Sequence, residues 1–401
     1  MKYLWFGVSL SEQDRQNIIK NGGQLFSAEV SNNTLLFGLE ENGVFCDTIN
    51  TYNLPSYPNY PLKKIEGYAW NRTERTNDYS VGYLNRKYIS ILSKTKAIKK
   101  AAQGWAKLNK NEEVVVFIYS MHSPFMSGAS CIKKIIPKAK IALIVPDLPQ
   151  YMDLKMSKVK AFLKKMDWLK IKYMMKKIDK YILYSKYMAE YLKLDNDKWM
   201  VMEGAIDLRM IVDEPIERDK EKHSIMYSGV LDLKYGIPEL LDAMKVLKGD
   251  YELWLAGAGN AVSLIQERAK EDDRIKYLGF YSSRKELLLK QKQATMLINP
   301  RAADEEIFKY SFPSKLFEYI ASGNPVISTN IAGIPEEYDK YLIKISDNTA
   351  KSIASAVEQI ASMSEEDRYA FGEKAKYFVM NEKSAKAQTS NILNFLNADR
   401  E

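Results

Sequence analysis

A lysine and a glutamate, Lys315 and Glu318, have types and a spacing that suit a ligand with both a phosphate and hydroxyl groups. They lie three residues apart in a predicted helix over Ser314–Ala321, with Ser311 as its expected N-cap, so they share one helix face. A cation in the first turn of a helix is unfavourable unless an anion binds nearby, because the helix start carries a partial positive charge. A phosphate at the helix start and a sugar hydroxyl on Glu318 would explain this layout. An ordinary capped helix with a Lys–Glu pair on its surface explains it equally well.

Alternating strands and helices must position these side chains. Apolar runs typical of buried strands occur at 114–119, 141–145 and 181–183 in the first half, and at 224–227, 252–256, 275–278, 295–299 and 326–328 in the second. Helical patterns between them predict an α/β protein with two Rossmann-like, doubly wound halves that meet near 203–216. Ligands bind at the carboxyl ends of such strands, so we expect a central cleft between the halves. Segments 8–23 and 50–85 are predicted to be loops, and 88–92 a strand.

Length and composition exclude several classes of protein. A chain of 401 residues with 46% hydrophobic and 27% charged residues can bury two cores and does not have the composition of a disordered protein. Its two cysteines, Cys46 and Cys131, exclude a disulfide framework and a structural zinc site. The sequence has no signal-peptide pattern and no apolar run long enough to span a membrane, so we expect a cytoplasmic protein.

Positive charge is concentrated in the first half. Segment 84–110 carries eight basic residues and no acid, and segment 155–180 carries ten lysines against two aspartates. Apolar residues keep helical spacing within the second segment: Val159, Phe162, Leu163, Met166, Leu169 and Tyr173. Such a pattern suits an anionic membrane, and it would place the protein peripherally on the inner face of the plasma membrane. A core helix with a solvated lysine face is an equal alternative, and no motif supports binding to nucleic acid.

The run PSKLFEYIASGNPVIS, residues 313–328, resembles the donor-binding signature of GT-B glycosyltransferases of family 4, the group 1 glycosyltransferases of the bacterial surface-polysaccharide type. Other segments similar to this family follow in the family's order along nearly the whole chain. They are Asn21-Gly22-Gly23, His122, Tyr184-Ser185, Glu203–Asp207, Tyr227–Gly229 with Gly236, Leu255–Gly259, Leu278–Phe280 and Asn299–Arg301. Matches in the correct order, each in a suitable strand–loop–helix context, are specific for the family but not for the sugar.

The resemblance implies both architecture and activity. It implies an acceptor-binding domain over 1–205, a nucleotide-sugar-binding domain over 206–380, and a C-terminal helix within 381–401 that packs back toward the first domain. The implied activity is retaining transfer of a sugar from a nucleotide-sugar, with a weak preference for UDP, to a saccharide or lipid-linked saccharide. Bacterial surface-polysaccharide or glycoconjugate synthesis is the implied setting. A GT-B-fold nucleotide-sugar epimerase and a non-catalytic GT-B-like binding module are the alternatives.

The resemblance also implies a donor site, and we expect this site to need no cofactor and no metal ion. Glu318 corresponds to the family's ribose-binding glutamate. The predicted donor-binding residues are Gly22, Gly23, Gly229, Lys234, Gly257, Gly259, Phe280, Arg301, Ser314, Lys315, Leu316 and Glu318. Arg301 and Lys315 are also predicted catalytic residues, because cations can stabilise the charge on the leaving diphosphate. The sequence has no Asp-x-Asp motif in a suitable setting, so we expect metal-independent chemistry.

One departure from the family concerns its paired glutamates. The first glutamate of the pair is replaced here by Tyr310. We expect the Tyr310 hydroxyl, Glu305 or Glu306 to take its place next to the transferred sugar.

A second departure concerns a basic pair that the family often places after the first strand of this domain. Val230 and Tyr235 occupy those two positions. We expect Arg301, Lys315 and Lys234 to bind the diphosphate instead, and the planar fork of Arg301 suits two phosphate contacts.

Two further candidates follow buried strands of the first half. His122 follows the 114–119 strand, and the resemblance implies that it binds and orients the transferred sugar and does not bind a metal ion. Asp147 follows the 141–145 strand and is predicted to contact the acceptor hydroxyl. A turn aspartate that bonds to its own backbone is an equal alternative for Asp147.

Overall fold

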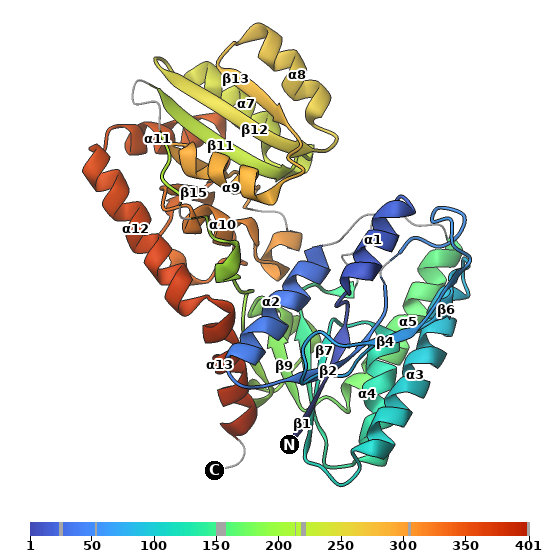
Figure 1. The fold of residues 1–401 in the computed structure, drawn as a ribbon. Helices are drawn as coiled ribbons and strands as arrows, with labels where there is room; N and C mark the ends of the chain where they lie inside the picture. The colour runs from blue at the N-terminus through green and yellow to red at the C-terminus, as the bar shows by residue number, and fades with distance from the viewer. Residues whose placement is uncertain are drawn as a thin grey trace. The chain divides into compact units, whose positions relative to one another are not determined.

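The computed structural model describes residues 1–23, 27–52, 54–149, 158–212, 214–217, 222–303 and 306–398. The chain forms two compact domains (Figure 1). The first domain consists of residues 1–205 and 385–401, and the second of residues 206–384. The chain therefore returns to the first domain at its C-terminal end.

The first domain is built on an eight-stranded sheet of order β10-β9-β8-β7-β1-β2-β5-β4. Its strands are β1 (Lys2–Gly7), β2 (Cys46–Asn50), β4 (Tyr68–Trp70), β5 (Asp78–Ser80), β7 (Val114–Tyr119), β8 (Lys140–Val145), β9 (Lys180–Leu183) and β10 (Trp199–Val201). All neighbours are parallel except β4 and β5. The six residues of β7 are all buried, as their continuous apolar run predicts.

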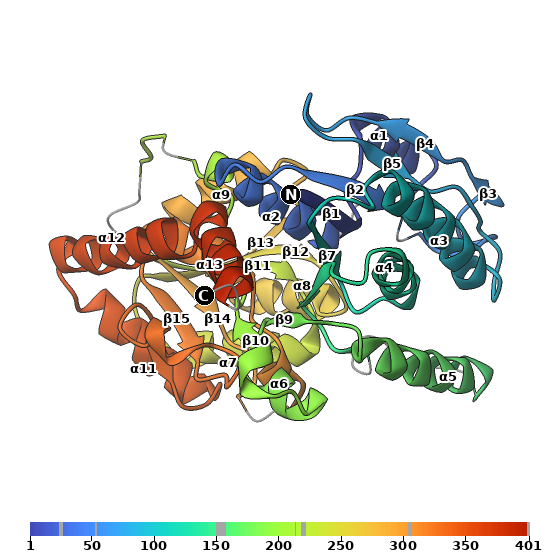
Figure 2. The same ribbon diagram turned by 90° about the horizontal axis from the view of Figure 1, so that it is seen from below.

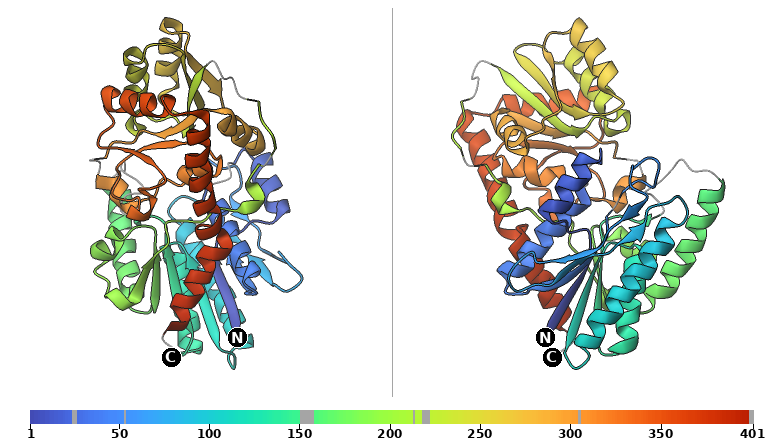
Figure 3. Two further views of the ribbon diagram at one scale, coloured as in Figure 1. Left: turned by 90° about the vertical axis from the view of Figure 1, so that its left-hand side faces the viewer. Right: turned by 45° about the vertical axis from the view of Figure 1, so that its right-hand side comes forward.

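Helices cover both faces of this sheet (Figures 1 and 3). They are α1 (Glu12–Lys20), α2 (Ser27–Glu41), α3 (Ser90–Leu108), α4 (Ser123–Ile135), α5 (Lys158–Met175), α6 (Tyr187–Leu192) and α13 (Ala385–Asn397), with a 3-10 turn η2 (Asn196–Lys198). The C-terminal helix α13 packs against α2 through direct contacts, including hydrogen bonds from Asn42 to Lys386 and Thr389.

Three local predictions for this domain are wrong. The 8–23 segment contains α1, which begins with a capping box in which Ser11 and Asp14 bond reciprocally to each other's backbone. The 50–85 segment holds β4 and β5 and also a small antiparallel pair, β3 (Lys64–Ile65) and β6 (Tyr83–Leu84). The 88–92 segment is not a strand, because α3 already begins at Ser90.

The second domain has a six-stranded, fully parallel sheet of order β13-β12-β11-β14-β15-β16. Its strands are β11 (His223–Val230), β12 (Tyr251–Ala258), β13 (Ile275–Gly279), β14 (Met296–Asn299), β15 (Val326–Thr329) and β16 (Ile343–Ile345). Its helices are α7 (Ile237–Val246), α8 (Val262–Glu271), α9 (Arg284–Gln293), α10 (Lys315–Ala321), α11 (Ala350–Ala361) and α12 (Glu365–Glu382). Four 3-10 turns complete it: η3 (Leu208–Met210), η4 (Leu233–Tyr235), η5 (Glu306–Tyr310) and η6 (Glu336–Tyr338).

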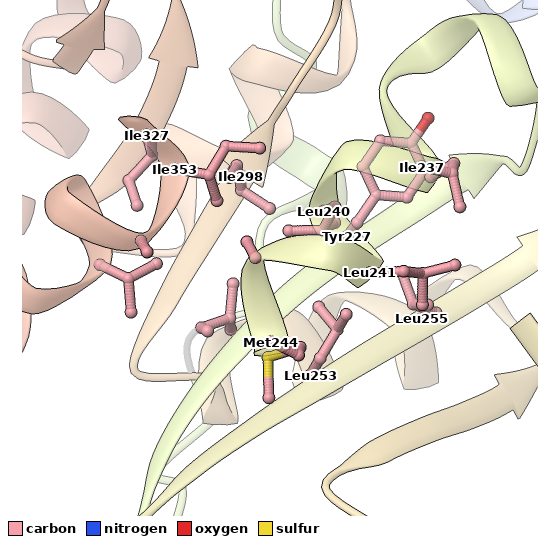
Figure 4. Close-up of a cluster of buried hydrophobic side chains, with 14 of the residues drawn as sticks. Tyr227, Ile237, Leu240, Leu241, Met244, Leu253, Leu255, Ile298, Ile327 and Ile353 are labelled. Atoms are coloured by element: carbon pink, nitrogen blue, oxygen red, sulfur yellow. The ribbon is translucent and has the colours of Figure 1, made fainter. Parts of the chain in front are cut away.

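One hydrophobic core of the second domain lies between its sheet and the helices α7 and α11. Figure 4 shows α7 directing Ile237, Leu240, Leu241 and Met244 toward side chains of the strands. Their partners include Tyr227, Leu253, Leu255, Ile298 and Ile327, all fully buried. This packing fixes the central strands, and with them the positions of the residues at their carboxyl ends.

No helix among the described residues is long and apolar enough to cross a lipid bilayer.

Candidate functional site

The centre of the second domain's sheet is the point where its strand order reverses. β11 lies between β12 and β14, so the chain proceeds outward in one direction through β12 and β13 and in the other through β14 to β16. The carboxyl ends of β11 and β14 carry Gly229 and Asn299. In open parallel sheets ligands bind at such a reversal. The geometry around these two strand ends therefore decides what the domain can bind.

Helix α10 is fixed against the end of β11 by one tyrosine. The Tyr319 hydroxyl accepts the Ser228 backbone N–H at 2.8 Å and donates to the Ser228 carbonyl at 2.9 Å. Lys315 lies one helical turn before Tyr319, so its side chain leaves the same face. Its Nζ lies 3.7 Å from the centroid of the Tyr227 ring. A Cβ at Gly229, whose φ is +126°, would lie 3.3 Å from this Nζ. The glycine therefore leaves the ammonium group room at the strand end.

Two cationic side chains at this edge have buried nitrogen atoms that make no hydrogen bond within the described part of the chain. Lys315 Nζ and Arg301 Nε are buried and have no hydrogen-bond acceptor among the described residues. The Arg301 guanidinium lies over the rings of Tyr235 and Phe308, 4.6 and 5.2 Å from their centroids. The Asn299 Oδ1 atom beside them is also buried without a donor.

The electrostatics of Lys315 follow from this arrangement. Burial lowers the pKa of Lys315 well below its ordinary value, and the positive charge of Arg301 lowers it further, while Glu318 acts weakly in the opposite direction. Burying an ammonium group without a partner is costly, and so is placing two cations near each other. A bound anion would remove both costs. An anion bound at this edge would therefore be favourable.

Glu318 has a partner other than Lys315. Its carboxylate pairs with Arg284, the first residue of α9, at 2.6 Å. The alternative of a surface Lys315–Glu318 pair is therefore wrong. Glu318 remains partly exposed, at 27%.

Helix α10 also begins later than predicted. Ser314 is its N-cap and makes no side-chain cap bond, whereas Ser311 follows η5 and does not cap the helix. Lys315 is consequently the first residue of the helix. A helix start without a side-chain cap leaves its amides available to another acceptor.

The other predicted donor-binding residues of this domain occupy three settings. Lys234 is exposed in η4, and Phe280 is 75% exposed directly after β13. Ser314 is exposed at the start of α10, whereas Leu316 is fully buried in the core behind it. Gly257 packs against the end of β11, because a Cβ there would lie 1.8 Å from the Gly229 carbonyl oxygen.

Gly259 lies just beyond β12, and it also packs closely against the backbone that follows β11. A Cβ there would lie 2.1 Å from the Leu231 carbonyl oxygen. Both Gly257 and Gly259 therefore shape the backbone at the carboxyl end of β11.

In the first domain, His122 lies directly after β7 as the N-cap residue of α4. Its ring meets the Phe125 ring edge-on, with the centroids 5.1 Å apart. Burial lowers the pKa of His122 to about 3, and the positive charges of Lys94 and Lys170 act in the same direction. The imidazole is therefore neutral at physiological pH, and it can hold a hydroxyl group but is poorly suited to donate a proton.

Asp147 follows β8, at the same edge of the sheet as His122. Its side chain is on the surface, and surrounding protein atoms still raise the pKa of its carboxyl group because they displace water from around it. A carboxylate of this kind gains from accepting a hydroxyl hydrogen bond.

Gly22 and Gly23 form the end of α1. The Gly22 N–H donates to the Ile19 carbonyl and the Gly23 N–H to the Ile18 carbonyl, the two bonds of a Schellman cap. Gly22 has a φ of +72°, which suits that position. The amides of both glycines thus serve the helix end, and their contact with a donor stays a prediction.

Comparison with known proteins identifies the second domain. Residues 222–363 match the sequence model of the family described as "Glycosyl transferases group 1". This segment begins just before β11 and contains Gly229, Arg301, Lys315 and Glu318. It is a group 1 glycosyl transferase domain. The predicted family is thereby confirmed for the domain that carries Lys315 and Arg301, and the chain is a glycosyltransferase. No curated protein matches the chain in sequence.

Solved structures confirm the GT-B fold over the whole length of this glycosyltransferase. Sucrose-phosphate synthase from Thermosynechococcus elongatus matches with a TM-score of 0.69 and 13% identity, over 100% of this chain and 99% of the other. The lipopolysaccharide outer core galactosyltransferase WaaB matches at 0.66 and 14%, over 100% of both chains. HepE of Anabaena, in complex with UDP, matches at 0.67 and 11%, over 99% of this chain and 100% of the other. At these identities the likeness shows the fold.

The expected substitutes for the missing first glutamate differ in exposure within the glycosyltransferase domain. Tyr310 is 8% exposed, and Glu306 begins η5 and pairs with Lys309 at 3.3 Å. Glu305 lies outside the described residues. Among these residues only the Glu306 carboxylate is both described and largely exposed, at 69%.

Sequence reasoning missed the residues that hold the site in place. Arg284 pairs with Glu318, Tyr319 fixes α10 to β11, and the Asn299 amide nitrogen donates to Ser328 at 3.1 Å. Tyr319 had a detectable signal, since it follows Lys315 by four residues on one helix face. Arg284 had none, because its partner lies 34 residues away in the chain.

The described residues contain no group of three or more His, Cys, Asp or Glu side chains that could hold a metal ion. The metal-independent mechanism of the glycosyltransferase stays a prediction.

Proposed function

We propose that this chain transfers a sugar, with retention of anomeric configuration, from a UDP-sugar to a saccharide or lipid-linked saccharide. The reaction would serve bacterial surface-polysaccharide or glycoconjugate synthesis in the cytoplasm. One observation carries the proposal: Lys315 and Arg301 bring buried, unpaired cationic nitrogens to the strand ends of a group 1 glycosyl transferase domain. A diphosphate has the charge that this pair lacks.

Each residue has a distinct part in the proposed reaction. The bond between the anomeric carbon and the diphosphate breaks, a bond to the acceptor oxygen forms, and the acceptor hydroxyl gives up its proton. Lys315 and Arg301 bind the diphosphate and stabilise the negative charge that develops as it leaves. Glu318 accepts the ribose hydroxyls.

The first domain supplies the groups that contact uncharged parts of the substrates. His122, neutral at physiological pH, orients the transferred sugar, and Asp147 accepts a hydrogen bond from the acceptor hydroxyl. The choice of UDP is supported by HepE, whose solved structures contain UDP and UDP with glucose.

Calorimetry with UDP, GDP, dTDP and ADP, each with Mg²⁺ and with EDTA, tests the donor site. We expect UDP to bind equally well in both conditions and to lose its binding in Lys315→Met. If none of the four nucleotides binds the wild-type protein, the proposed donor site is wrong and a non-catalytic binding module becomes the better explanation.

Product analysis then tests the reaction. Once the donor sugar is known, the donor alone should remain unchanged on incubation, and addition of a saccharide acceptor should release UDP. Epimerised donor in the sample without acceptor would show a nucleotide-sugar epimerase instead.

A further inference from the structure

The amphipathic helix α5 (Lys158–Met175) packs on α4 with one side only. Ile171 and Met174 are 2% and 5% exposed, and the Ser127 hydroxyl of α4 contacts the Met174 sulfur at 3.5 Å. Figures 2 and 3 show α5 at the outer edge of the helix layer, with α4 on one side and no described element of the first domain on the other. One face of α5 is therefore part of the core, and the other faces solvent.

The apolar residues of the free face are large and aligned. Phe162, Met166, Leu169 and Tyr173 recur at intervals of four, three and four residues, so they form one stripe. They are 63%, 52%, 54% and 65% exposed, and Leu163 beside them is 44% exposed. Single exposed apolar side chains are ordinary, but a continuous stripe of them indicates a binding surface. The alternative that these residues pack into the core is therefore wrong.

Lysines border this stripe. Lys165 and Lys172 are exposed on the same side of α5, and neither forms an ion pair with any described residue. The helix contains six lysines and a single acid, Asp167. Five exposed apolar side chains thus lie within a strongly positive surface.

We propose that this free face of α5, defined by Phe162, Leu163, Lys165, Met166, Leu169, Lys172 and Tyr173, docks the enzyme onto an anionic lipid bilayer. A bilayer accepts apolar side chains at the acyl boundary and lysines at the headgroups at the same time. A second copy of the chain would bring identical lysines together, which is unfavourable. A nucleic acid would satisfy the lysines but leave the apolar stripe in water.

Vesicle flotation of the full chain tests this proposal. The probes are vesicles of phosphatidylcholine with about 30% phosphatidylglycerol, an anionic lipid, and vesicles of phosphatidylcholine alone. We expect binding to the anionic vesicles only, with a marked loss at high salt. Equal binding to both vesicles, or to neither, would overturn the proposal.

Paired variants assign the binding to this face. Each lysine near an anionic surface contributes a factor of roughly five, so Lys165→Gln with Lys172→Gln should weaken binding roughly 25-fold. Phe162→Ser with Leu169→Ser should abolish detectable binding. Two matched control pairs lie elsewhere on the surface: Lys351→Gln with Lys374→Gln, and Tyr369→Ser with Tyr377→Ser on α12, whose tyrosines are 61% and 71% exposed. If the controls weaken binding as much as the α5 variants do, this face is not the docking surface.

Two further readouts separate the alternatives. If this face joined two copies of the chain, sedimentation would show a wild-type dimer that is lost in Phe162→Ser with Leu169→Ser. Such a dimer, in a wild-type protein that does not bind vesicles, would overturn the proposal. Binding of a DNA or RNA duplex that exceeds vesicle binding would do the same. UDP binding is measured on the same variants and should be unchanged, so a failure of the donor site is distinguishable from a failure of the docking surface.

Discussion

The strand ends of the two domains treat charge in opposite ways. In the second domain, Lys315 Nζ and Arg301 Nε lie buried at the sheet edge without a hydrogen-bond acceptor among the described residues. In the first domain, the loss of surrounding water lowers the pKa of His122 and raises that of Asp147, so both groups are pushed toward their neutral forms. The same doubly wound architecture thus presents an edge that attracts an anion and an edge that suits uncharged hydroxyl groups. This division would suit the proposed reaction between a charged nucleotide-sugar and a neutral acceptor.

The largest expected effect concerns the cationic edge. Lys315→Met should weaken UDP binding at least 100-fold, a loss of about 3–5 kcal/mol, because a buried diphosphate would lose its partner. The ligand-free protein should unfold at the same or a higher temperature, since the variant removes a buried, unpaired charge. Calorimetry and thermal unfolding measure the two quantities. Lys351→Met, on the exposed surface of α11, is the control. A destabilised variant that still binds UDP would make Lys315 a structural residue.

The next effect concerns the neutral edge and depends on pH. The pKa of His122 is about 3 in the folded protein and about 6.5 in the unfolded chain, so below pH 6.5 the unfolded state binds more protons. Stability should therefore fall as the pH drops, and at pH 4 the cost from this residue should be about 3 kcal/mol. Urea unfolding of wild type and His122→Gln at pH 7 and pH 4 measures it, and the variant should lose less stability. Equal losses in both proteins would show that His122 is not held neutral.

A smaller effect is expected at Glu318. Glu318→Gln should weaken UDP binding roughly 10- to 100-fold, because a hydrogen bond to a charged group is worth about 1.5–3 kcal/mol. The preference of the wild-type protein for UDP over 2′-deoxy-UDP should also shrink, since the ribose hydroxyl loses its acceptor. Arg284→Gln is the matched control, because it removes the partner of Glu318 and keeps the carboxylate. If Glu318→Gln keeps the preference for UDP over 2′-deoxy-UDP, Glu318 does not bind the ribose.

The smallest effect is expected at Asp147, where only the direction follows from the structure. Because surrounding protein atoms displace water and raise the pKa of this surface carboxyl group, its charged form is costly, and Asp147→Asn should raise the melting temperature at pH 7. The gain should disappear at pH 3, where the wild-type carboxyl is protonated in both the folded and the unfolded state. A lower melting temperature at pH 7 would favour a turn aspartate that supports its own backbone.

Elements with a continuous apolar pattern were predictable, and polar or short ones were not. The buried strands β7, β8 and β9 and the five strands β11 to β15 follow directly from their apolar runs, because a strand covered on both faces admits few polar residues. Helix α1 was missed because it is mostly polar, although its capping residues Ser11 and Asp14 gave a usable signal. Strands β3 to β6 contain only two or three residues each, which is too short to show a period.

The sequence by itself determined the family of the second domain and predicted the chemistry of its site, because both depend on residue types and on their order along the chain. Lys315, Arg301 and Glu318 were predicted as site residues in that way. Only the tertiary structure decided what each side chain faces. It placed Lys315 at Gly229 and Glu318 at Arg284, and it left the apolar stripe of α5 in solvent. The physical reason is that burial and pairing depend on the neighbouring elements, and a helix of given sequence does not specify which of its faces they will cover.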